Sequence, residues 1–343
     1  MNKIKFDNQR FESIQLCRAI AAFFVYISHF YWIGLKITIG TFLMLFFCIS
    51  GFIMMYSTNK NNKYYFSKRL IKILPLYWLI TVGTFLIALI VPSFLPQAPS
   101  VIELIKSLLF IPYSREAIHS AEVIRPIVGL GWTLNIEMFF YVIFGLCLLI
   151  SKKYRGIICS IIFILFYIIH EIFDLTFCIP LYFWTNGYLL AFVSGIILYY
   201  ILQRLYSLKE YNWLEILLVV LLIVLIPIML FSNSIPLSWP YNHVILSTLF
   251  LFVVIILFRT IKLPKFIVRF GDISFSFYLI HYFVILFMDR YFCDTDAYSV
   301  KMMVALVIGF IISVILSNIS YELIEKRLSK FLKTKLINSE KTI

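Results

Sequence analysis

The feature that most constrains this chain is the repeated return of apolar windows about 20 residues long. A transmembrane helix needs about 20 mainly apolar residues to cross the hydrocarbon core of a bilayer. Hydrophobic residues make up 62% of the 343 residues, above the roughly 45–50% of soluble domains. The sequence therefore predicts an all-α integral membrane protein with about ten transmembrane helices. The windows lie at roughly 14–34, 38–57, 73–95, 133–151, 156–173, 178–203, 213–231, 241–258, 272–292 and 302–322.

The positions of the basic residues predict how the helices are oriented. A net charge of +13 is also typical of nucleic-acid binding, but here the charge follows the spans. With ten spans, 23 of the 30 Lys and Arg residues fall on one side of the membrane. The positive-inside rule makes that side cytoplasmic, with both termini inside. We expect no nucleic-acid partner, and we expect part of this charge to contact anionic headgroups.

The sequence predicts a single membrane domain over 1–343, with a core at 14–327, a basic cytoplasmic tail at 326–343 and no separate soluble domain. The first apolar stretch is too long for a signal peptide and lacks a cleavage site, so we expect a retained helix. The segment 101–113 of the longest outer connection is too short to span and is predicted to be interfacial or re-entrant. Six scattered cysteines form no CxxC pair, so we expect packing residues and no metal site.

Two polar groups in the first window are the best functional clue. Arg18 and His29 stand at the two ends of the apolar stretch "RAIAAFFVYISH". On a helix this spacing is about three turns, a rise of about 16 Å, and it places both side chains on one face. Charged groups inside a span usually face a bundle interior or a water-filled cavity. The pattern indicates one cavity along this span; the alternatives are a snorkelling arginine and a packed polar histidine.

Glu137 lies about one turn into the fourth window, in the segment "GWTLNIEMFFY". An acidic side chain in the first turn of a helix can interact favourably with the helix dipole. It can also meet His29, because both residues lie near the outer ends of their predicted spans. A carboxylate beside an imidazole orients the ring and strengthens it as a base. The second interpretation predicts a base, His29, and a residue that orients it, Glu137.

A dense basic segment opens the third window. Lys68, Arg69 and Lys72 stand at i, i+1 and i+4, so they share a helical face. The positive-inside rule alone accounts for charge at this position. The functional alternative is a site for a phosphorylated cytosolic ligand, with Arg18 at the same depth, since Lys and Arg together suit phosphate oxygens.

Three further segments each allow two interpretations. Ser50 and Gly51 lie in mid-span, where small residues serve close helix packing or a site. His281 falls near mid-bilayer in "GDISFSFYLIHYFV" and is either bonded across helices or functional. Glu322 and Glu325 either anchor the last span at the interface or pair with the basic segment of the third window. The HExxH, GxSxG, GxGxxG and P-loop patterns are absent. No constellation surrounds the remaining histidines, which are His119, His170 and His243.

In order along the chain, these segments resemble the membrane acyltransferase-3 family, the integral-membrane O-acyltransferases of bacterial surface polysaccharides and related acceptors. That family's first helix carries Arg or Lys, ten residues and then His, here Arg18 and His29. Two departures are Lys72, where the family often has a second arginine, and the lack of the outer esterase-like domain of many members. We therefore expect the membrane domain itself, or a separate partner, to complete the transfer. The other matches are "FFCISGF" at 46–52, "KRLIKILPLYW" at 68–78, the Trp-Thr-Leu-x-x-Glu-x-x-Phe motif at 132–140, Gly271 through His281 and "YELIEK" at 321–326.

The resemblance implies acyl transfer, most often of acetyl from acetyl-CoA, to a glycan hydroxyl. We expect the CoA arm to run beside the first span toward the outer leaflet, with His29 as general base and Glu137 holding its ring. A thioester requires no covalent enzyme intermediate, although both routes stay open. Four residues are expected to neutralise the donor's phosphates: Arg18, Lys68, Arg69 and Lys72. The candidates for binding the acceptor or the oxyanion are Trp132, Thr133, Asn135, Tyr278 and His281.

The expected partners are acetyl-CoA as donor, a polysaccharide or lipid-linked glycan as acceptor, and the lipid bilayer, with no metal. The expected location is a bacterial inner membrane, and a homo-oligomer is one option left open. The main rival is a transporter or flippase of a polysaccharide precursor, with Arg18, His29 and Glu137 lining the path. Against a transporter, the sequence shows no inverted repeat and no broken helix pair. A polysaccharide polymerase, the third class, needs no cytosolic phosphate site.

Overall fold

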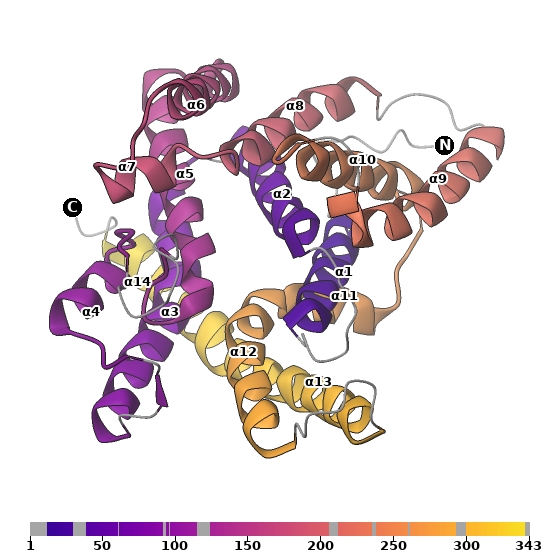
Figure 1. Cartoon of the computed structure of the whole chain (residues 1–343). Helices are drawn as coiled ribbons and strands as arrows, with labels where there is room; N and C mark the ends of the chain where they lie inside the picture. The colour runs from indigo at the N-terminus through magenta and orange to yellow at the C-terminus, as the bar shows by residue number, and fades with distance from the viewer. Residues whose placement is uncertain are drawn as a thin grey trace. The chain divides into compact units, whose positions relative to one another are not determined.

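The computed structural model describes residues 12–29, 39–60, 62–91, 94–95, 97–114, 124–205, 212–234, 238–259, 261–292 and 300–339. Within these ranges the chain is almost entirely helical, and its only β-type pairing is an isolated bridge between Ser114 and Ile124. The all-α prediction is confirmed. The α-helices (Figure 1) are α1 (Glu12–His29), α2 (Ile39–Lys60), α3 (Tyr65–Ile90), α4 (Val101–Leu108), α5 (Trp132–Ile150), α6 (Arg155–Ile172), α7 (Ile179–Trp184), α8 (Leu189–Leu205), α9 (Asn212–Leu230), α10 (Tyr241–Leu257), α11 (Lys265–Asp272), α12 (Ser274–Phe292), α13 (Val300–Ser320) and α14 (Ser329–Ser339).

Each of the ten predicted windows contains a helix. Six helical stretches of the described chain are long and apolar enough to cross a membrane, and a seventh counts if α11 and α12 form one bent span. The apolar parts of α9 and α10, Ile216–Leu230 and Tyr241–Leu257, are shorter. The last five residues of the first predicted window, 30–34, lie outside the described residues. The chain is a membrane protein with several apolar spanning helices.

The described helices fall into two compact units. The first unit comprises residues 1–62 and 187–316, and so contains α1, α2, α8 to α12 and most of α13. The second comprises residues 63–186 and 317–343, and contains α3 to α7 and α14. The prediction of one membrane domain stays a prediction, and each unit is described by itself.

In the first unit, glycines let α2 and α8 cross with their backbones in contact. A Cβ at Gly51 would collide with the carbonyl of Phe192, and one at Gly195 would collide with the carbonyl of Cys48. Helix α10 covers this crossing, where Thr248 donates to the Ser194 hydroxyl at 2.8 Å. Small residues at an interface allow this close approach in membranes. The packing interpretation of Ser50-Gly51 is therefore confirmed for Gly51.

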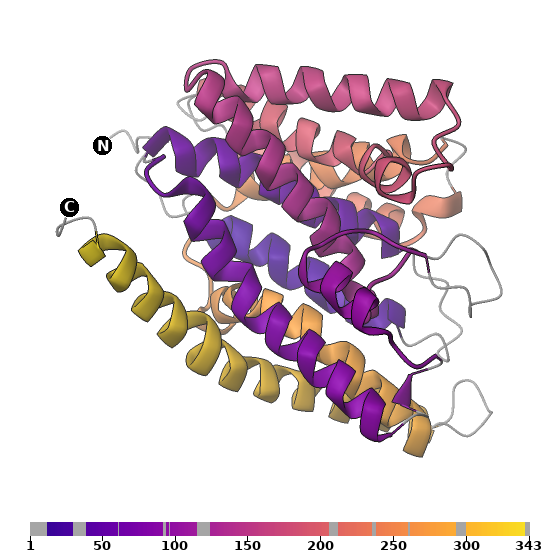
Figure 2. The same ribbon diagram turned by 90° about the vertical axis from the view of Figure 1, so that its left-hand side faces the viewer.

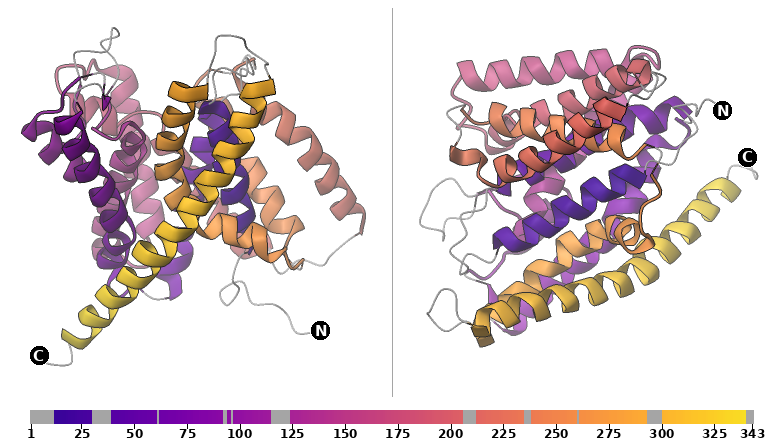
Figure 3. Two further views of the ribbon diagram at one scale, coloured as in Figure 1. Left: turned by 90° about the horizontal axis from the view of Figure 1, so that it is seen from below. Right: turned by 90° about the vertical axis from the view of Figure 1, so that its right-hand side faces the viewer.

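Helix α1 is central to the first unit, where it packs against α2, α10, α11 and α12 (Figure 3). Gly271, at the end of α11, lies directly against the backbone of Gln15. The chain then bends by 73° between α11 and α12. The expectation of no broken helix pair is therefore wrong. The reason is that α11 is short and amphipathic, with Lys265 and Arg269 on one side, so it does not continue the apolar span.

In the second unit, Ser107 fixes the predicted interfacial segment to α3. Its hydroxyl lies 2.9 Å from the Tyr113 hydroxyl and accepts a hydrogen bond from the Ile127 N–H at 3.1 Å. Its carbonyl accepts from the Tyr77 hydroxyl at 3.2 Å. A capping box formed by Ser100 and Glu103 starts α4. The segment predicted at 101–113 thus forms a short helix, with apolar side chains exposed on its outer face: Val101, Ile102 and Ile105.

One long helical path ends the described chain (Figure 2). Helix α13 continues into a π-helical segment, Tyr321–Leu328, and then into α14. The boundary between the two units falls at Ser317, about one turn before the π-helical segment. Glu322 pairs with Lys326 one turn on, at 2.8 Å, and the segment packs against α3.

The described cysteines behave as packing residues. None of the five forms a disulfide, and the sixth, Cys293, lies outside the described residues. No group of three or more His, Cys, Asp or Glu side chains gathers in the described chain. The four fully buried cysteines are Cys17, Cys48, Cys147 and Cys159.

Candidate functional site

The predicted site residues divide between the two units. The first unit holds Arg18, His29, Tyr278 and His281. The second holds the basic segment of α3, at Lys68, Arg69 and Lys72, and the first turns of α5, at Trp132, Thr133, Asn135 and Glu137. The predicted meeting of His29 with Glu137, and of Arg18 with the α3 segment, would join the units and stays a prediction.

Within the first unit, His29 meets His281. The distance from His29 Nδ1 to His281 Nε2 is 3.4 Å, and the ring centroids are 5.2 Å apart at 60°. His29 is the last residue of α1 and is half-buried, whereas His281 has no exposed surface. The two residues are 252 positions apart in sequence, so only the fold brings them together.

Backbone carbonyls decide which nitrogen of each ring carries hydrogen. His29 Nδ1 lies 2.7 Å from the carbonyl oxygen of Val25, and His281 Nδ1 lies 2.8 Å from that of Phe277. A carbonyl oxygen only accepts, so both Nδ1 atoms donate. In a neutral ring, Nε2 is then the acceptor. His281 Nε2 therefore faces the Nδ1–H of His29, and His29 Nε2 is the atom able to take a proton.

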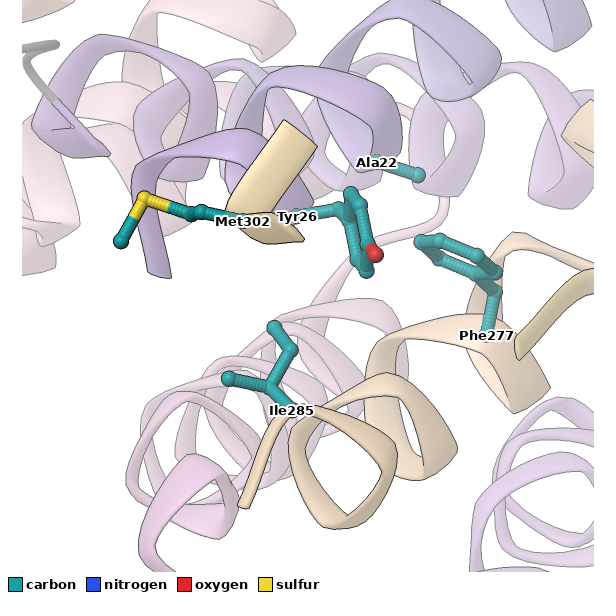
Figure 4. Close-up of a cluster of buried hydrophobic side chains, with 5 residues drawn as sticks. All are labelled: Ala22, Tyr26, Phe277, Ile285 and Met302. Atoms are coloured by element: carbon teal, nitrogen blue, oxygen red, sulfur yellow. The ribbon is translucent and has the colours of Figure 1, made fainter. Parts of the chain in front are cut away.

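An aromatic cluster holds His281 in place. Phe277 stacks on the imidazole at 5.4 Å and 8°, and Tyr26 contacts it edge-on at 6.1 Å. Tyr26 is itself fixed, since its hydroxyl donates to the carbonyl of Leu306 at 2.7 Å. Figure 4 shows Tyr26 packed among apolar side chains of α1, α12 and α13: Ala22, Phe277, Ile285 and Met302.

Arg18 lies two turns before Tyr26 on α1, where Ala22 and Tyr26 pack against Phe277 of α12. It is half-buried, and no hydrogen bond or ion pair joins it to another described side chain. At this end of α1, the Glu12 carboxylate accepts from the Leu263 N–H at 3.2 Å. Helix α11 brings two basic residues, Lys265 and Arg269, to this end of α1. The sequence analysis gave them no role in a site, although the amphipathic pattern of the helix was a signal.

In the second unit, Tyr141 links Glu137 to Arg69. Its hydroxyl donates to Glu137 Oε1, one turn away on α5. The Arg69 guanidinium carbon lies 5.9 Å from the centroid of the Tyr141 ring, within cation–π range. Tyr65, one turn before Arg69 on α3, donates to the Tyr141 carbonyl at 3.2 Å. Arg69 therefore contacts the residues around Glu137, while its predicted neighbours on α3, Lys68 and Lys72, are half-buried.

The first turns of α5 contain one buried polar side chain whose amide is not bonded. Asn135 is 1% exposed, and neither its amide oxygen nor its amide nitrogen has a hydrogen-bond partner among the described residues. Thr133, by contrast, donates to the carbonyl of Leu130 at 3.0 Å. Trp132 packs edge-on against Phe183 at 6.4 Å. Burying an amide without hydrogen bonds costs free energy, so a ligand or water that bonds to Asn135 would be favoured.

Two further histidines have polar neighbours that the sequence analysis missed. His243 Nδ1 lies 2.8 Å from the Thr41 hydroxyl and 3.2 Å from the Ser232 hydroxyl, all three buried. His170 Nδ1 lies 3.2 Å from the Thr185 hydroxyl. These partners come from other elements of the fold, so no local sequence motif indicates them. The remaining histidine, His119, lies outside the described residues.

Comparison with known sequences shows which family the chain belongs to. A sequence model of the acyltransferase-3 family, described as "Acyltransferase domain", matches residues 11–322, so the chain belongs to that family. The chain is also 29% identical over 157 residues to the "Exopolysaccharide production protein ExoZ" of Rhizobium meliloti (strain 1021). That match covers 45% of this chain and 48% of the relative, about half the length of each. No solved structure matches the chain.

Proposed function

We propose that the protein transfers an acyl group, acetyl from acetyl-CoA, to a sugar hydroxyl of an exopolysaccharide or its lipid-linked precursor. Family membership supports acyl transfer, and the name of the similar protein supports an exopolysaccharide acceptor. The observation that carries the proposal is the state of His29. Its Nδ1 donates to the Val25 carbonyl, so the neutral ring has its basic atom at Nε2.

In this mechanism His29 acts as general base. As the sugar oxygen attacks the thioester carbon, its O–H bond breaks and the proton moves to His29 Nε2. The C–S bond then breaks, and the leaving thiolate takes the proton from His29 Nε2, which restores the neutral ring. A positioned base of this kind contributes typically about 10²- to 10⁴-fold to a rate.

Basic side chains are proposed to hold the CoA phosphates. Arg18 lies about 16 Å below His29 along α1, a distance suited to the extended arm of the donor. Lys68, Arg69 and Lys72 of the second unit remain the proposed partners of Arg18. In the first unit, Lys265 and Arg269 of α11 lie near the same end of α1 and can add to this charge.

Asn135 is the preferred candidate for stabilising the oxyanion. Trp132, Thr133, Tyr278 and His281 were the other candidates, but Thr133 and His281 already bond to backbone carbonyls. The buried amide of Asn135 has no partner among the described groups. A preorganised donor in a dry site is worth about 2.7–4 kcal/mol toward the transition state.

Transfer of label tests this proposal. Membranes with wild-type, His29→Ala or Arg18→Ala protein at matched levels receive [acetyl-¹⁴C]acetyl-CoA and exopolysaccharide or its lipid-linked precursor. We expect label in the glycan with wild type, a loss of about 10²- to 10⁴-fold with His29→Ala and weaker donor binding with Arg18→Ala. Transfer by His29→Ala at the wild-type rate would contradict the base assignment.

The same membranes discriminate the transporter interpretation, which the bend between α11 and α12 favours. Glycan flux without any acetylated product would support a transporter and contradict the acyltransferase proposal. The predicted location in a bacterial inner membrane, with both termini cytoplasmic, is tested separately by labelling of single cysteines at the two ends of the chain.

A further inference from the structure

We infer that His281 is the positioning residue of His29, an inference that rests on the proposed function. The sequence pattern favours Glu137 for this task. Within the first unit, however, the group beside His29 Nδ1 is the imidazole of His281, at 3.4 Å. His281 acts through His29 and not on the substrate.

The hydrogen-bond directions fit this role. His281 Nδ1–H donates to the Phe277 carbonyl, so its Nε2 lone pair faces His29. His29 Nδ1–H is then shared between the Val25 carbonyl and His281 Nε2. Two acceptors on one side of the ring fix both its tautomer and its orientation, with Nε2 on the opposite side.

The contact between His29 and His281 also stabilises the positive charge that forms on His29 during the reaction. When the sugar hydroxyl gives its proton to His29 Nε2, the ring becomes an imidazolium, and its Nδ1–H becomes a stronger donor. The bond to His281 Nε2 then strengthens, because a hydrogen bond from a charged donor is roughly twice as strong as a neutral one. His281 keeps its own proton, so no proton is gained or lost by the pair after the thiolate leaves.

The surroundings of His281 favour a neutral partner over a carboxylate. His281 has no exposed surface, and Phe277 and Tyr26 cover its ring. Burying a carboxylate at this depth would cost a large free energy of desolvation. A neutral imidazole supplies an acceptor without that cost, provided that its other nitrogen is bonded, as the contact with Phe277 ensures.

Two conservative variants separate positioning from a merely structural role. In His281→Gln, the amide lies near the position of Nε2 and can still accept from His29. In His281→Asn, the amide lies near the position of Nδ1, so it can keep the bond to Phe277 but not the contact with His29. Both variants are purified in detergent and compared with wild type for kcat and for the KM of acetyl-CoA.

We expect His281→Gln to stay within about 10-fold of the wild-type kcat, and His281→Asn to lose about 10- to 100-fold, both with an unchanged KM for acetyl-CoA. As a matched control, His243→Gln and His243→Asn remove another buried histidine of the same unit. They should change the yield of folded protein without a difference in kcat between them.

Equal activity of His281→Gln and His281→Asn, or higher activity of His281→Asn, would overturn the inference, because the bond to Phe277 would then be the one that matters. A rise in the KM for acetyl-CoA without loss of kcat would also overturn it. If wild-type protein transfers no acyl group, the proposed function itself fails, and the inference falls with it. Transfer by wild type with no difference between the two variants overturns the inference alone.

Discussion

The two units hold different kinds of polar groups at their centres. In the first unit the central polar contact is between two imidazoles, His29 and His281, whose other bonds go to carbonyls of their own helices. In the second unit the central polar group is charged: Glu137 and Arg69 meet through the ring and hydroxyl of Tyr141. The first unit thus pairs two neutral groups, and the second holds half-buried opposite charges around an aromatic bridge.

The difference indicates which unit tolerates change. When a substitution removes one partner of a neutral hydrogen-bonded pair, one uncharged polar group is left unpaired, and a local adjustment of the structure can give it a new partner. Removing one partner of a half-buried charged network leaves the other charge without its counter-charge, which costs more. The backbone packing shows the opposite ranking, because close helix contacts through glycine are found in the first unit at Gly51 and Gly195.

The largest effect is expected for a methyl group at the α2–α8 crossing. In Gly195→Ala, the new Cβ would collide with the carbonyl of Cys48, which is backbone and cannot move aside. We expect a loss of about 1–3 kcal/mol or more in the free energy of unfolding. The matched control in the second unit is Gly83→Ala, because a Cβ there meets nothing within 4 Å.

For Gly83→Ala we expect no loss, and a gain of up to about 1 kcal/mol from helix propensity. Unfolding of both variants in mixed micelles by titration with SDS measures the difference. Equal stabilities of the two alanine variants would break the comparison, since they would show that α2 and α8 are not in backbone contact.

Much of this packing follows from the sequence, but not the partners. The apolar windows located the helices, because a span needs a minimum length of apolar residues. The "SGF" segment indicated a small residue at an interface. Neither pattern says that Gly51 meets Phe192, since that contact depends on how α2 and α8 cross. The sequence analysis also missed the bend at residues 272–274, for a related reason. The apolar window that starts at 272 does not show that the preceding helix, α11, points away from the axis of α12.

The next effect concerns the charged network of the second unit. Tyr141→Phe removes the hydroxyl that donates to Glu137 and keeps the ring beside Arg69, whereas Glu137→Gln removes the charge. A hydrogen bond to a charged group is worth about 1.5–3 kcal/mol, so each variant should lose about 10- to 100-fold in kcat of acyl transfer. Because both variants weaken the same bond between Tyr141 and Glu137, the double variant should lose no more than the larger single loss.

Multiplied losses in the double variant would instead show that Glu137 acts elsewhere, as the prediction that it orients His29 requires. The kcat of all four proteins, with the folded fraction measured by size-exclusion chromatography, decides between these outcomes. The Glu137–Tyr141 bond was within reach of sequence reasoning, because the residues stand at i and i+4 on one helix face. The contacts of His281 with His29 and of Arg69 with Tyr141 were not, because each joins distant parts of the chain.

A smaller difference is expected between two buried hydroxyls. Ser107→Ala in the second unit removes the acceptor of the Ile127 N–H and the partner of Tyr113. An N–H left buried without its acceptor costs about 1–3 kcal/mol. Thr41→Val in the first unit should cost about 1 kcal/mol or less, because Ser232 and His243 still bond to each other at 3.2 Å.

The midpoint of thermal unfolding in detergent measures both changes, and limited proteolysis locates them. Ser107→Ala should open cleavage sites in the outer segment around α4, whereas Thr41→Val should open none there. A larger loss for Thr41→Val would reverse the ranking of the two units and show that the neutral network around His243 is the more sensitive one.

The smallest effect is expected for the charged pair at the surface of the second unit. Glu322 and Lys326 lie 2.8 Å apart with side chains 41% and 61% exposed. Water screens such a pair, and i,i+4 pairs are worth about 0.3–0.5 kcal/mol. Glu322→Ala should therefore change the free energy of unfolding by no more than about 0.5 kcal/mol, and 1 M salt should abolish the change. The charge-reversed double variant Glu322→Lys, Lys326→Glu serves as the matched control.

A loss for Glu322→Ala as large as that for Ser107→Ala would mean that Glu322 also pairs with the neighbouring basic residues of α3, as one interpretation of the last span predicted. Glu322 would then resemble Glu137, which meets Arg69 of α3 through Tyr141, and the contrast between the two carboxylates would not hold.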